Sequence, residues 1–416
     1  MYIYKVGVVG AGTMGAQIAQ VVSFAGIPVL LTDVNEAAVQ RGLQTVRSIY
    51  QVRVDKGKMT AEQLEEKMLL MTAVADVRAL KDVDLVVEAI PEVLKLKQQL
   101  FRELDTACSP GAILASNTSA LSISALGAVT QRPSKVLGLH FFNPAYAMPL
   151  VEVIPGLLSD SQTVDDVVGF AESIRKAPIV VKECAGFLVN RLLMPYVNEA
   201  ILCLQEGTTS LKEIDQEMTA FGMPVGPFTL LDQLGLDIAA EVARILHQSY
   251  GPRMAPAALL DALVKAGRLG VKSGRGFYNY RGANQGEGDG ELERLIHQIK
   301  EEAKIKAEKD QAGRRKTTST SARLLLPMVN EAATALQEGV SSARDIDLAM
   351  VAGIGFPTDK EGPLHYADRL GIDHVLGELE GFSQSLGMRF WPAPILRRMV
   401  DAGLTGRSAG RGFFMY

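Results

Sequence analysis

The chain has few of the residues that mark several large classes of protein. Of its 416 residues only three are cysteines, Cys108, Cys184 and Cys203, and no two of them form a CxxC motif. Disulfide scaffolds and zinc domains need paired or closely spaced cysteines, so this pattern argues against both and fits a reducing compartment. We therefore expect no metal centre.

Long runs of one character are also absent. No apolar segment has the length of a membrane span, and no long basic block accompanies the net charge of −4. The N-terminus leads directly into an expected strand at 4–10, so we expect no signal peptide. These absences predict a cytoplasmic protein without membrane insertion and without a nucleic-acid partner.

A glycine-rich turn follows the first expected strand. In GAGTMG, Gly10, Gly12 and Gly15 have the G-x-G-x-x-G spacing, and a helical pattern and a second strand ending in Asp33 come next. Such glycines let the backbone approach a pyrophosphate at a helix N-terminus. The acidic residue at the end of the next strand can bind the adenosine ribose. The alternative is a glycine-rich turn in an unrelated α/β domain.

Asp33 also bears on the choice of cofactor. Its carboxylate would repel a 2′-phosphate, and the following residues, Val34 and Asn35, supply no cation to bind one. This predicts NAD rather than NADP.

Further strands are expected at 84–90, 112–119, 135–141, 149–154 and 177–183. Ser119, His140 and Glu152 lie at or just past the ends of these strands, where open parallel sheets bind ligands. The chain has only five histidines. A core histidine with a strand-end glutamate is the simpler interpretation of 138–156, but the strand-end placement favours acid–base chemistry.

A helical, charged segment lies at about 36–70 and carries a group of basic residues that includes Arg53 and Lys56. Two interpretations remain open. The group is either a solvated face or a seat for substrate phosphates.

The residues after 184 are helical and contain a repeat. RLLMPYVNEAILCLQEGTTSLKEIDQEM, from Arg191, matches RLLLPMVNEAATALQEGVSSARDIDLAM, from Arg323, at more than half of its positions. The similarity extends to 267–280 against 403–416. Asn190 precedes the first copy and Ala322 precedes the second. An asparagine found in one copy only is a candidate for function.

These patterns predict an α/β Rossmann-like dinucleotide-binding domain followed by two tandem, duplicated all-α domains. The predicted boundaries are 1–183 for the NAD-binding domain, 184–282 for the first helical domain, 283–314 for a linker with a helix, and 315–416 for the second helical domain.

Several motifs together resemble one family, the L-3-hydroxyacyl-CoA dehydrogenases. They are GAGTMG, VVEAIPE, SNTSALSI, GLHFFNPAYAMPLVEVIPG, GFLVNRLLMPYVNEA, GPFTLLDQLGLD and KSGRGFYNY, and they cover nearly the whole chain. The doubled helical part resembles the dehydrogenase half of multifunctional fatty-acid oxidation enzymes, here without an enoyl-CoA hydratase domain. Ala185 stands where the family usually has a proline.

The resemblance implies NAD-dependent, reversible oxidation of L-3-hydroxyacyl-CoA to 3-oxoacyl-CoA in β-oxidation. It makes His140 the general base and Glu152 its partner, with Ser119 and Asn190 positioning the substrate oxygens. The cofactor contacts that it adds to the glycine motif and Asp33 are Glu92, Lys97, Asn143 and Lys272. If the basic group at about 36–70 is a seat for substrate phosphates, Arg53 and Lys56 would contact the CoA substrate together with Ser119.

Assembly and partners follow from the same resemblance. Single-copy relatives pair through their one helical domain, so two copies in one chain predict a monomer with an internal pseudo-dimer. Enoyl-CoA hydratase and thiolase would act as functional partners on other chains. Two alternatives stay open: a dehydrogenase for a 3-hydroxy acid not linked to CoA, and a catalytically silent scaffold that binds CoA or NAD.

Overall fold

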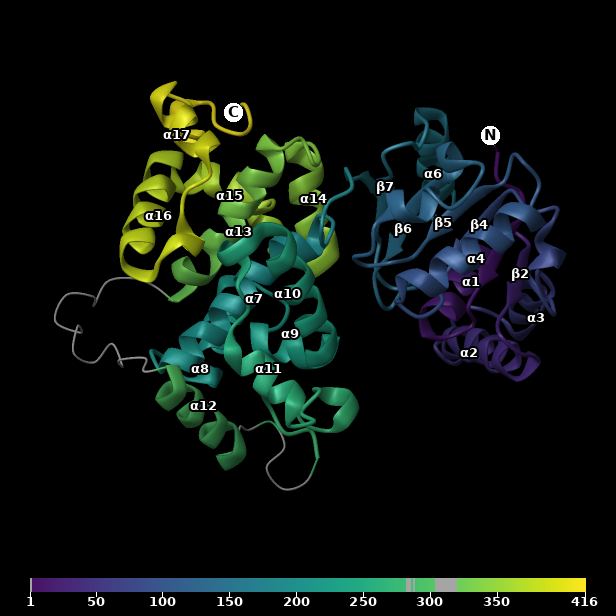
Figure 1. Ribbon diagram of the computed structural model, residues 1–416, viewed down its shortest axis with the longest axis horizontal. Coiled ribbons are helices and arrows are strands. Elements are labelled where there is room, and N and C mark those ends of the chain that lie inside the picture. The colour runs from purple at the N-terminus through teal and green to yellow at the C-terminus, as the bar shows by residue number, and fades with distance from the viewer. Residues whose placement is uncertain (1, 282–285, 287–288, 304–319) are drawn as a thin grey trace. The chain divides into compact units, whose positions relative to one another are not determined.

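The computed structural model describes residues 2–281, 286, 289–303 and 320–416. The chain divides into two compact units, Met1–Phe187 and Leu188–Tyr416, which Figure 1 distinguishes by colour along the chain. The predicted linker at 283–314 is described only at 286 and 289–303, and its other residues lie outside the described part.

The first unit is an α/β domain with an eight-stranded sheet among its described residues, in the order β3-β2-β1-β4-β5-β6-β7-β8. The strands are β1 (Val6–Val9), β2 (Val29–Thr32), β3 (Met71–Ala73), β4 (Leu85–Glu88), β5 (Ile113–Ser116), β6 (Val136–Phe141), β7 (Leu150–Pro155) and β8 (Ala177–Val180). The central strands are continuous apolar runs, as expected for strands that are covered on both faces.

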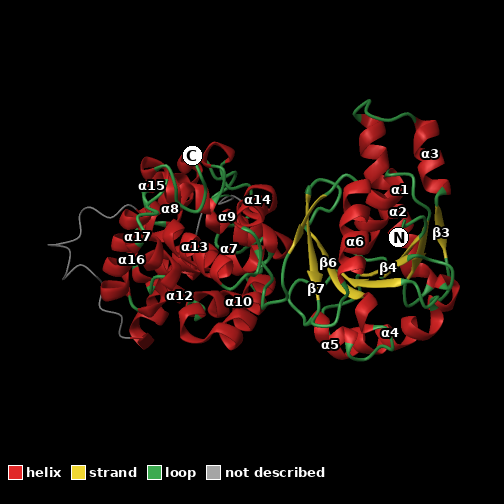
Figure 2. Ribbon diagram, turned by 90° about the horizontal axis from the view of Figure 1, so that it is seen from above, coloured by secondary structure: helices red, strands yellow, loops and turns green. Residues whose placement is uncertain are grey.

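Helices cover both faces of this sheet. Figure 2 shows α1, α2 and α6 on one side and α4 and α5 on the other. The helices of this unit are α1 (Thr13–Phe24), α2 (Glu36–Asp55), α3 (Ala61–Leu69), α4 (Leu94–Ala107), α5 (Ile123–Gly127) and α6 (Ser161–Ser173), with short 3₁₀ turns η1 (Val77–Leu80) and η2 (Pro133–Lys135). This layered arrangement confirms the predicted Rossmann-like domain.

The strand order reverses at β1, which has β2 on one side and β4 on the other. Ligands of open α/β sheets bind at the carboxyl ends of strands at such a reversal. Strand β7 runs antiparallel to β6, whereas the other pairs of neighbouring strands in the described sheet are parallel. The short edge strand β3 was not expected from the sequence, because only Met71 of its three residues is buried.

The second unit is helical. Its elements up to residue 303 are α7 (Val189–Glu206), α8 (Leu211–Phe221), α9 (Pro227–Leu234), α10 (Leu236–Tyr250), η3 (Gly251–Met254), α11 (Ala258–Lys265), η4 (Val271–Ser273) and α12 (Gly290–Ala303). Those from residue 320 are α13 (Thr320–Gln337), α14 (Ala343–Ile354), η6 (Thr358–Lys360), α15 (Pro363–Leu370), α16 (Ile372–Leu386), η7 (Met388–Phe390), α17 (Pro394–Asp401) and η8 (Arg407–Ala409). Both helical stretches predicted as separate domains lie within this one compact unit. In the described part of the chain, which includes both units, no helix has the length and hydropathy of a membrane span.

Helices α7 and α13 pack against each other and exchange buried ion pairs. Arg191 of α7 binds Glu331 of α13, with Nε 2.6 Å from Oε1, and Arg323 of α13 binds Glu199 of α7, with Nε 2.7 Å from Oε1. Arginine and glutamate are eight residues apart in each helix, so the two contacts are equivalent and reciprocal. Residue i of one stretch contacts residue j of the other, and the reverse also holds.

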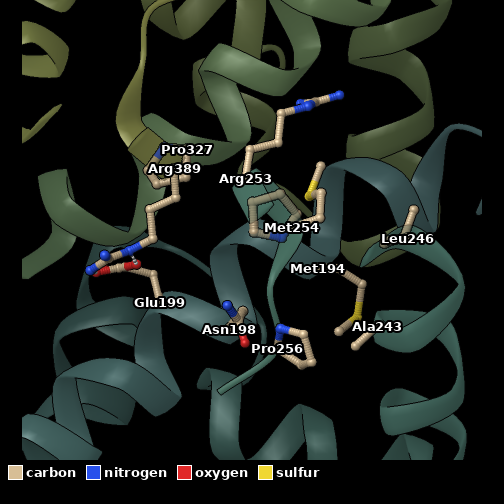
Figure 3. A pocket seen from close by; sticks show the side chains of 11 residues that line it. Met194, Asn198, Glu199, Ala243, Leu246, Arg253, Met254, Pro256, Pro327 and Arg389 are labelled. Atoms are coloured by element: carbon tan, nitrogen blue, oxygen red, sulfur yellow. Dashed lines mark hydrogen bonds and ion pairs between the residues drawn. The ribbon is translucent and has the colours of Figure 1, made fainter. Parts of the chain in front are cut away.

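A second arginine reaches each of these glutamates. Arg253 of η3 binds Glu331, and Arg389 of η7 binds Glu199 with Nε 2.7 Å from Oε2. Figure 3 shows Arg389 over Glu199 beside a small cavity. The cavity has a volume of about 30 Å³, which is enough to hold a water molecule.

These reciprocal pairs generate a prediction about stability. Glu331→Gln should lower the free energy of unfolding by about 3 kcal/mol, because it leaves fully buried Arg191 without its nearest charge partner. Glu199→Gln should cost a similar amount, since its environment is equivalent. Urea denaturation of each purified variant measures the loss.

The control is Glu361→Gln, whose exposed carboxylate lies 3.4 Å from Arg369. Its unfolding free energy should stay within about 0.5 kcal/mol of wild type. Equal urea midpoints for the Glu331 and Glu361 variants would contradict the assigned role of the buried pairs.

Candidate active site

The turn between β1 and α1 is built for close backbone approach. Gly10 has a φ of +99°, and a Cβ there would lie 2.6 Å from the carbonyl oxygen of Ala89. A Cβ on Gly15 would lie 1.7 Å from the carbonyl oxygen of Gly10. Both positions therefore require glycine, and the turn is pressed against the segment that follows β4.

The N-terminus of α1 is open. Gly12 is its N-cap residue, and among the described atoms no side chain caps the helix and none lies within 4 Å of where a Cβ of Gly12 would stand. Free backbone N–H groups and the positive end of the helix dipole therefore face open space. This is the arrangement that binds a pyrophosphate, so the residues fit a dinucleotide.

Asp33, which directly follows β2, is tied to the same turn. Its Oδ2 accepts a hydrogen bond from the backbone N–H of Ala11 at 2.6 Å, and its Oδ1 accepts one from Val34 at 2.6 Å. Each carboxylate oxygen retains a further acceptor site. The carboxylate is thus held in place beside the glycine turn, and it can still accept hydrogen bonds from ribose hydroxyls.

His140 and Glu152 form a buried pair across two strands. The antiparallel register of β6 and β7 sets the two residues directly opposite each other, on one face of the sheet. His140 Nδ1 lies 2.7 Å from Glu152 Oε2. The carboxylate therefore fixes the ring through Nδ1, which leaves Nε2 as the nitrogen that can exchange a proton with a substrate.

A second buried charge pair lies at the ends of β4 and β5. Lys97 of α4, whose side chain is 1% exposed, has its Nζ 2.6 Å from Oε1 of fully buried Glu88. The same ammonium reaches Glu92 Oε2 at 3.3 Å. Ser116 donates to the other oxygen of Glu88 at 2.6 Å. The Lys97 ammonium is thus enclosed by carboxylates, and its contact with Glu92 links it to the residues that follow the strand ends.

Glu92 in turn holds Ser119. Its Oε1 accepts hydrogen bonds from the backbone N–H of Ser119 at 2.9 Å and from the Ser119 hydroxyl at 3.3 Å. The hydroxyl of Thr118 donates to the same oxygen at 2.5 Å. A chain of contacts therefore runs from the buried Glu88–Lys97 pair through Glu92 to Ser119, three residues beyond the end of β5.

Asn143 lies in the loop after β6 and is exposed. Its Oδ1 accepts a hydrogen bond from Gln17 Nε2 at 3.2 Å. Lys176 anchors the same loop by donating to the carbonyl oxygens of Ala145 and Met148, at 2.5 and 2.7 Å. Burial lowers the pKa of the Lys176 amine to about 8.

Arg53 and Lys56 lie at the C-terminal end of α2. The Arg53 guanidinium lies over the ring of Phe24, 4.5 Å from its centroid, and Lys56 is exposed. No carboxylate in the described part of the chain pairs with either residue, so both charges are available to an anion.

The remaining predicted residues, Asn190 and Lys272, belong to the second unit. Asn190 lies in the first turn of α7. Lys272 of η4 makes an ion pair with Asp237, with Nζ 2.5 Å from Oδ1. Within the described ranges, no group of three or more His, Cys, Asp or Glu side chains could hold a metal ion.

Gln17 and Glu88 were not predicted from the sequence as residues of the site. Gln17 stands among the apolar residues of the buried face of α1, and Glu88 ends an otherwise apolar strand. A polar side chain in a buried run is the signal that could have identified both, because such groups are kept only with partners.

Comparison with known proteins assigns the chain to a family. Residues 5–184 match the model of the 3-hydroxyacyl-CoA dehydrogenase NAD binding domain, and residues 186–280 and 320–416 match that of the 3-hydroxyacyl-CoA dehydrogenase C-terminal domain. The protein therefore belongs to the 3-hydroxyacyl-CoA dehydrogenase family, and its first unit is an NAD-binding domain.

Individual relatives agree with this assignment. The fatty acid oxidation complex subunit alpha of Shewanella amazonensis is 38% identical over 406 residues, which cover 97% of this chain and 56% of the relative. The chain thus spans little more than half the length of this curated relative.

Solved structures include two 3-hydroxybutyryl-CoA dehydrogenases. The enzyme from Escherichia coli K12 is 29% identical, with a TM-score of 0.84 over 97% of this chain and 99% of that one. PaaH1 from Ralstonia eutropha, an (S)-3-hydroxybutyryl-CoA dehydrogenase, is 40% identical, with a TM-score of 0.66 over 67% of this chain and 100% of that one.

The geometry of Asp33 generates a prediction about cofactor choice. Wild type should favour NAD over NADP by at least about tenfold, or roughly 1.4 kcal/mol, because the fixed carboxylate repels a 2′-phosphate. Asp33→Ser should lower the preference for NAD over NADP. Binding of both cofactors, measured by calorimetry, tests it.

Asp76→Ser serves as the matched control, because this carboxylate pairs with Arg78 elsewhere in the same unit. It should leave the NAD/NADP ratio unchanged. Wild-type protein that binds both cofactors equally would remove Asp33 from this role.

Proposed function

We propose that the protein oxidises L-3-hydroxyacyl-CoA to 3-oxoacyl-CoA with NAD, reversibly. The observation that carries the proposal is the buried His140–Glu152 pair, with its 2.7 Å contact, in the same sheet as the dinucleotide turn. The names of the similar solved enzymes, which are 3-hydroxybutyryl-CoA dehydrogenases, support this substrate class.

The chain's own part in the reaction is to move a proton and to hold the substrate. Bound NAD would supply the acceptor for the hydride that leaves C3. His140 Nε2 would take the proton from the 3-hydroxyl as the carbonyl forms, and Glu152 would stabilise the resulting imidazolium. In the reverse direction the same imidazolium would return the proton.

Substrate binding is divided among several residues in this proposal. Ser119, held by Glu92, and Asn190 would bind the substrate oxygens. Arg53 and Lys56 would bind the phosphates of CoA, which their unpaired charges in the described structure support. The cofactor contacts proposed are the glycine turn, Asp33, Glu92, Asn143 and Lys272, with Lys97 acting through Glu92.

The general-base role generates a prediction. His140→Gln should lower kcat by about 10²–10⁴-fold, the usual contribution of a positioned acid–base group, while NAD binding stays nearly unchanged. The rate is read from NADH absorbance with 3-hydroxybutyryl-CoA as substrate.

The second unit provides a matched control. His365 Nδ1 lies 2.7 Å from Asp347 Oδ2, the same distance as in the proposed catalytic pair. His365→Gln should retain kcat within about twofold. If His140→Gln turned over as fast as His365→Gln, the proposed base would be wrong.

We also infer that the helical unit is an internal pseudo-dimer of two duplicated domains. The equivalent order of helices and the reciprocal Arg191–Glu331 and Arg323–Glu199 pairs support this, because such exchange is typical of a two-fold interface. The model of the C-terminal domain matches two separate stretches of the chain, 186–280 and 320–416, which supports the duplication as well.

In a pseudo-dimer within one chain, each copy already covers the face through which the other would pair with a second chain. We therefore propose that the protein is a monomer. Light scattering after size exclusion should give the chain mass of 44.8 kDa at micromolar concentration. A stable mass of twice that value would contradict the proposal.

The reaction also defines its neighbours. An enoyl-CoA hydratase would supply the substrate and a thiolase would consume the product, both in the cytoplasm. The name of the Shewanella relative, a subunit of a fatty acid oxidation complex, supports this context.

A further inference from the structure

The Gln17 side chain bridges two segments of the nucleotide-binding unit. It lies in α1, two residues beyond Gly15, and is 7% exposed. Its Nε2 is 3.2 Å from Asn143 Oδ1, and its Oε1 is 2.6 Å from the backbone nitrogen of Ala145. These contacts span 126 and 128 residues of sequence, so one amide joins the dinucleotide-binding helix to the loop that follows His140.

The donors and acceptors in this bridge have a fixed order. The backbone N–H of Ala145 can only donate, so the atom facing it must be the carbonyl oxygen of Gln17. The amide nitrogen of Gln17 then faces Asn143, where it can only donate, so Asn143 accepts through Oδ1. The Nδ2 group of Asn143 is consequently turned away from Gln17, on an exposed residue, as a hydrogen-bond donor.

We propose that Gln17 is a positioning residue that orients the amide of Asn143 so that its N–H₂ group donates to the nicotinamide half of bound NAD. The proposal rests on the proposed function, which makes Asn143 a cofactor contact. Without Gln17 the Asn143 side chain can rotate by half a turn and present its oxygen instead. The interaction of Asn143 with the cofactor would then be lost even though Asn143 is present.

A double-mutant cycle on NAD affinity tests this. Gln17→Met keeps the volume of the side chain but removes both polar contacts, and Asn143→Ala removes the group that Gln17 is proposed to orient. Each single variant should raise the Kd of NAD about tenfold. If Gln17 acts through Asn143, the double variant should also be weakened about tenfold rather than about a hundredfold.

The control is Gln20→Met on the same helix. Gln20 is also buried, and its Oε1 has no hydrogen-bond partner among the described residues. Its Kd for NAD should stay within about twofold of wild type. An equal loss in Gln17→Met and Gln20→Met, or a hundredfold loss in the double variant, would overturn the positioning role.

Calorimetry of NAD binding keeps this test separate from the proposed reaction. Wild-type protein that binds NAD but does not oxidise 3-hydroxyacyl-CoA would refute the proposed function, and the cycle would still report on Gln17. If wild-type protein is active but the double variant loses about a hundredfold in NAD affinity, only the role of Gln17 would be refuted.

Discussion

The antiparallel pairing of β6 with β7 is the constraint on which the candidate site depends. It sets His140 opposite Glu152, and a shift of one residue would turn the glutamate to the other face of the sheet. The apolar residues around both strands fix this register. Glu152 is fully buried, and a buried carboxylate is tolerated only with a partner, so the pair and the register stabilise each other.

Buried charges elsewhere in the protein set geometry in the same way. The Glu88–Lys97 pair fixes Glu92, which orients Ser119, and the reciprocal pairs of α7 and α13 fix the packing of two helices. Such pairs add little net stability compared with apolar packing, because both charges lose their hydration. Losing one partner is costly, however, and the arrangement is therefore well determined.

Much of the site could be predicted because its signals are local in sequence. The glycine turn, Asp33, and the strand ends that carry Ser119, His140 and Glu152 can be recognised from spacing and hydrophobic pattern alone. Gln17 is recognisable as a polar residue in a buried run, but its partners could not be assigned in this way, because they are more than a hundred residues away. The contact of Arg191 with Glu331 could not be predicted either. Glu199, in the same helix as Arg191, is two turns away, and the partner glutamate comes from the second copy only when the two helices pack. The edge strand β3 is too short and too exposed to produce a pattern.

Transfer of the substrate proton by His140 can be tested by the pH dependence of kcat/KM for oxidation of 3-hydroxybutyryl-CoA. For wild type, the rate should fall about tenfold per pH unit on the acid side, because a protonated imidazole cannot accept the proton. The residual activity of His140→Gln should lack this acid limb. An identical acid limb in the His140→Gln variant would show that another group carries the proton.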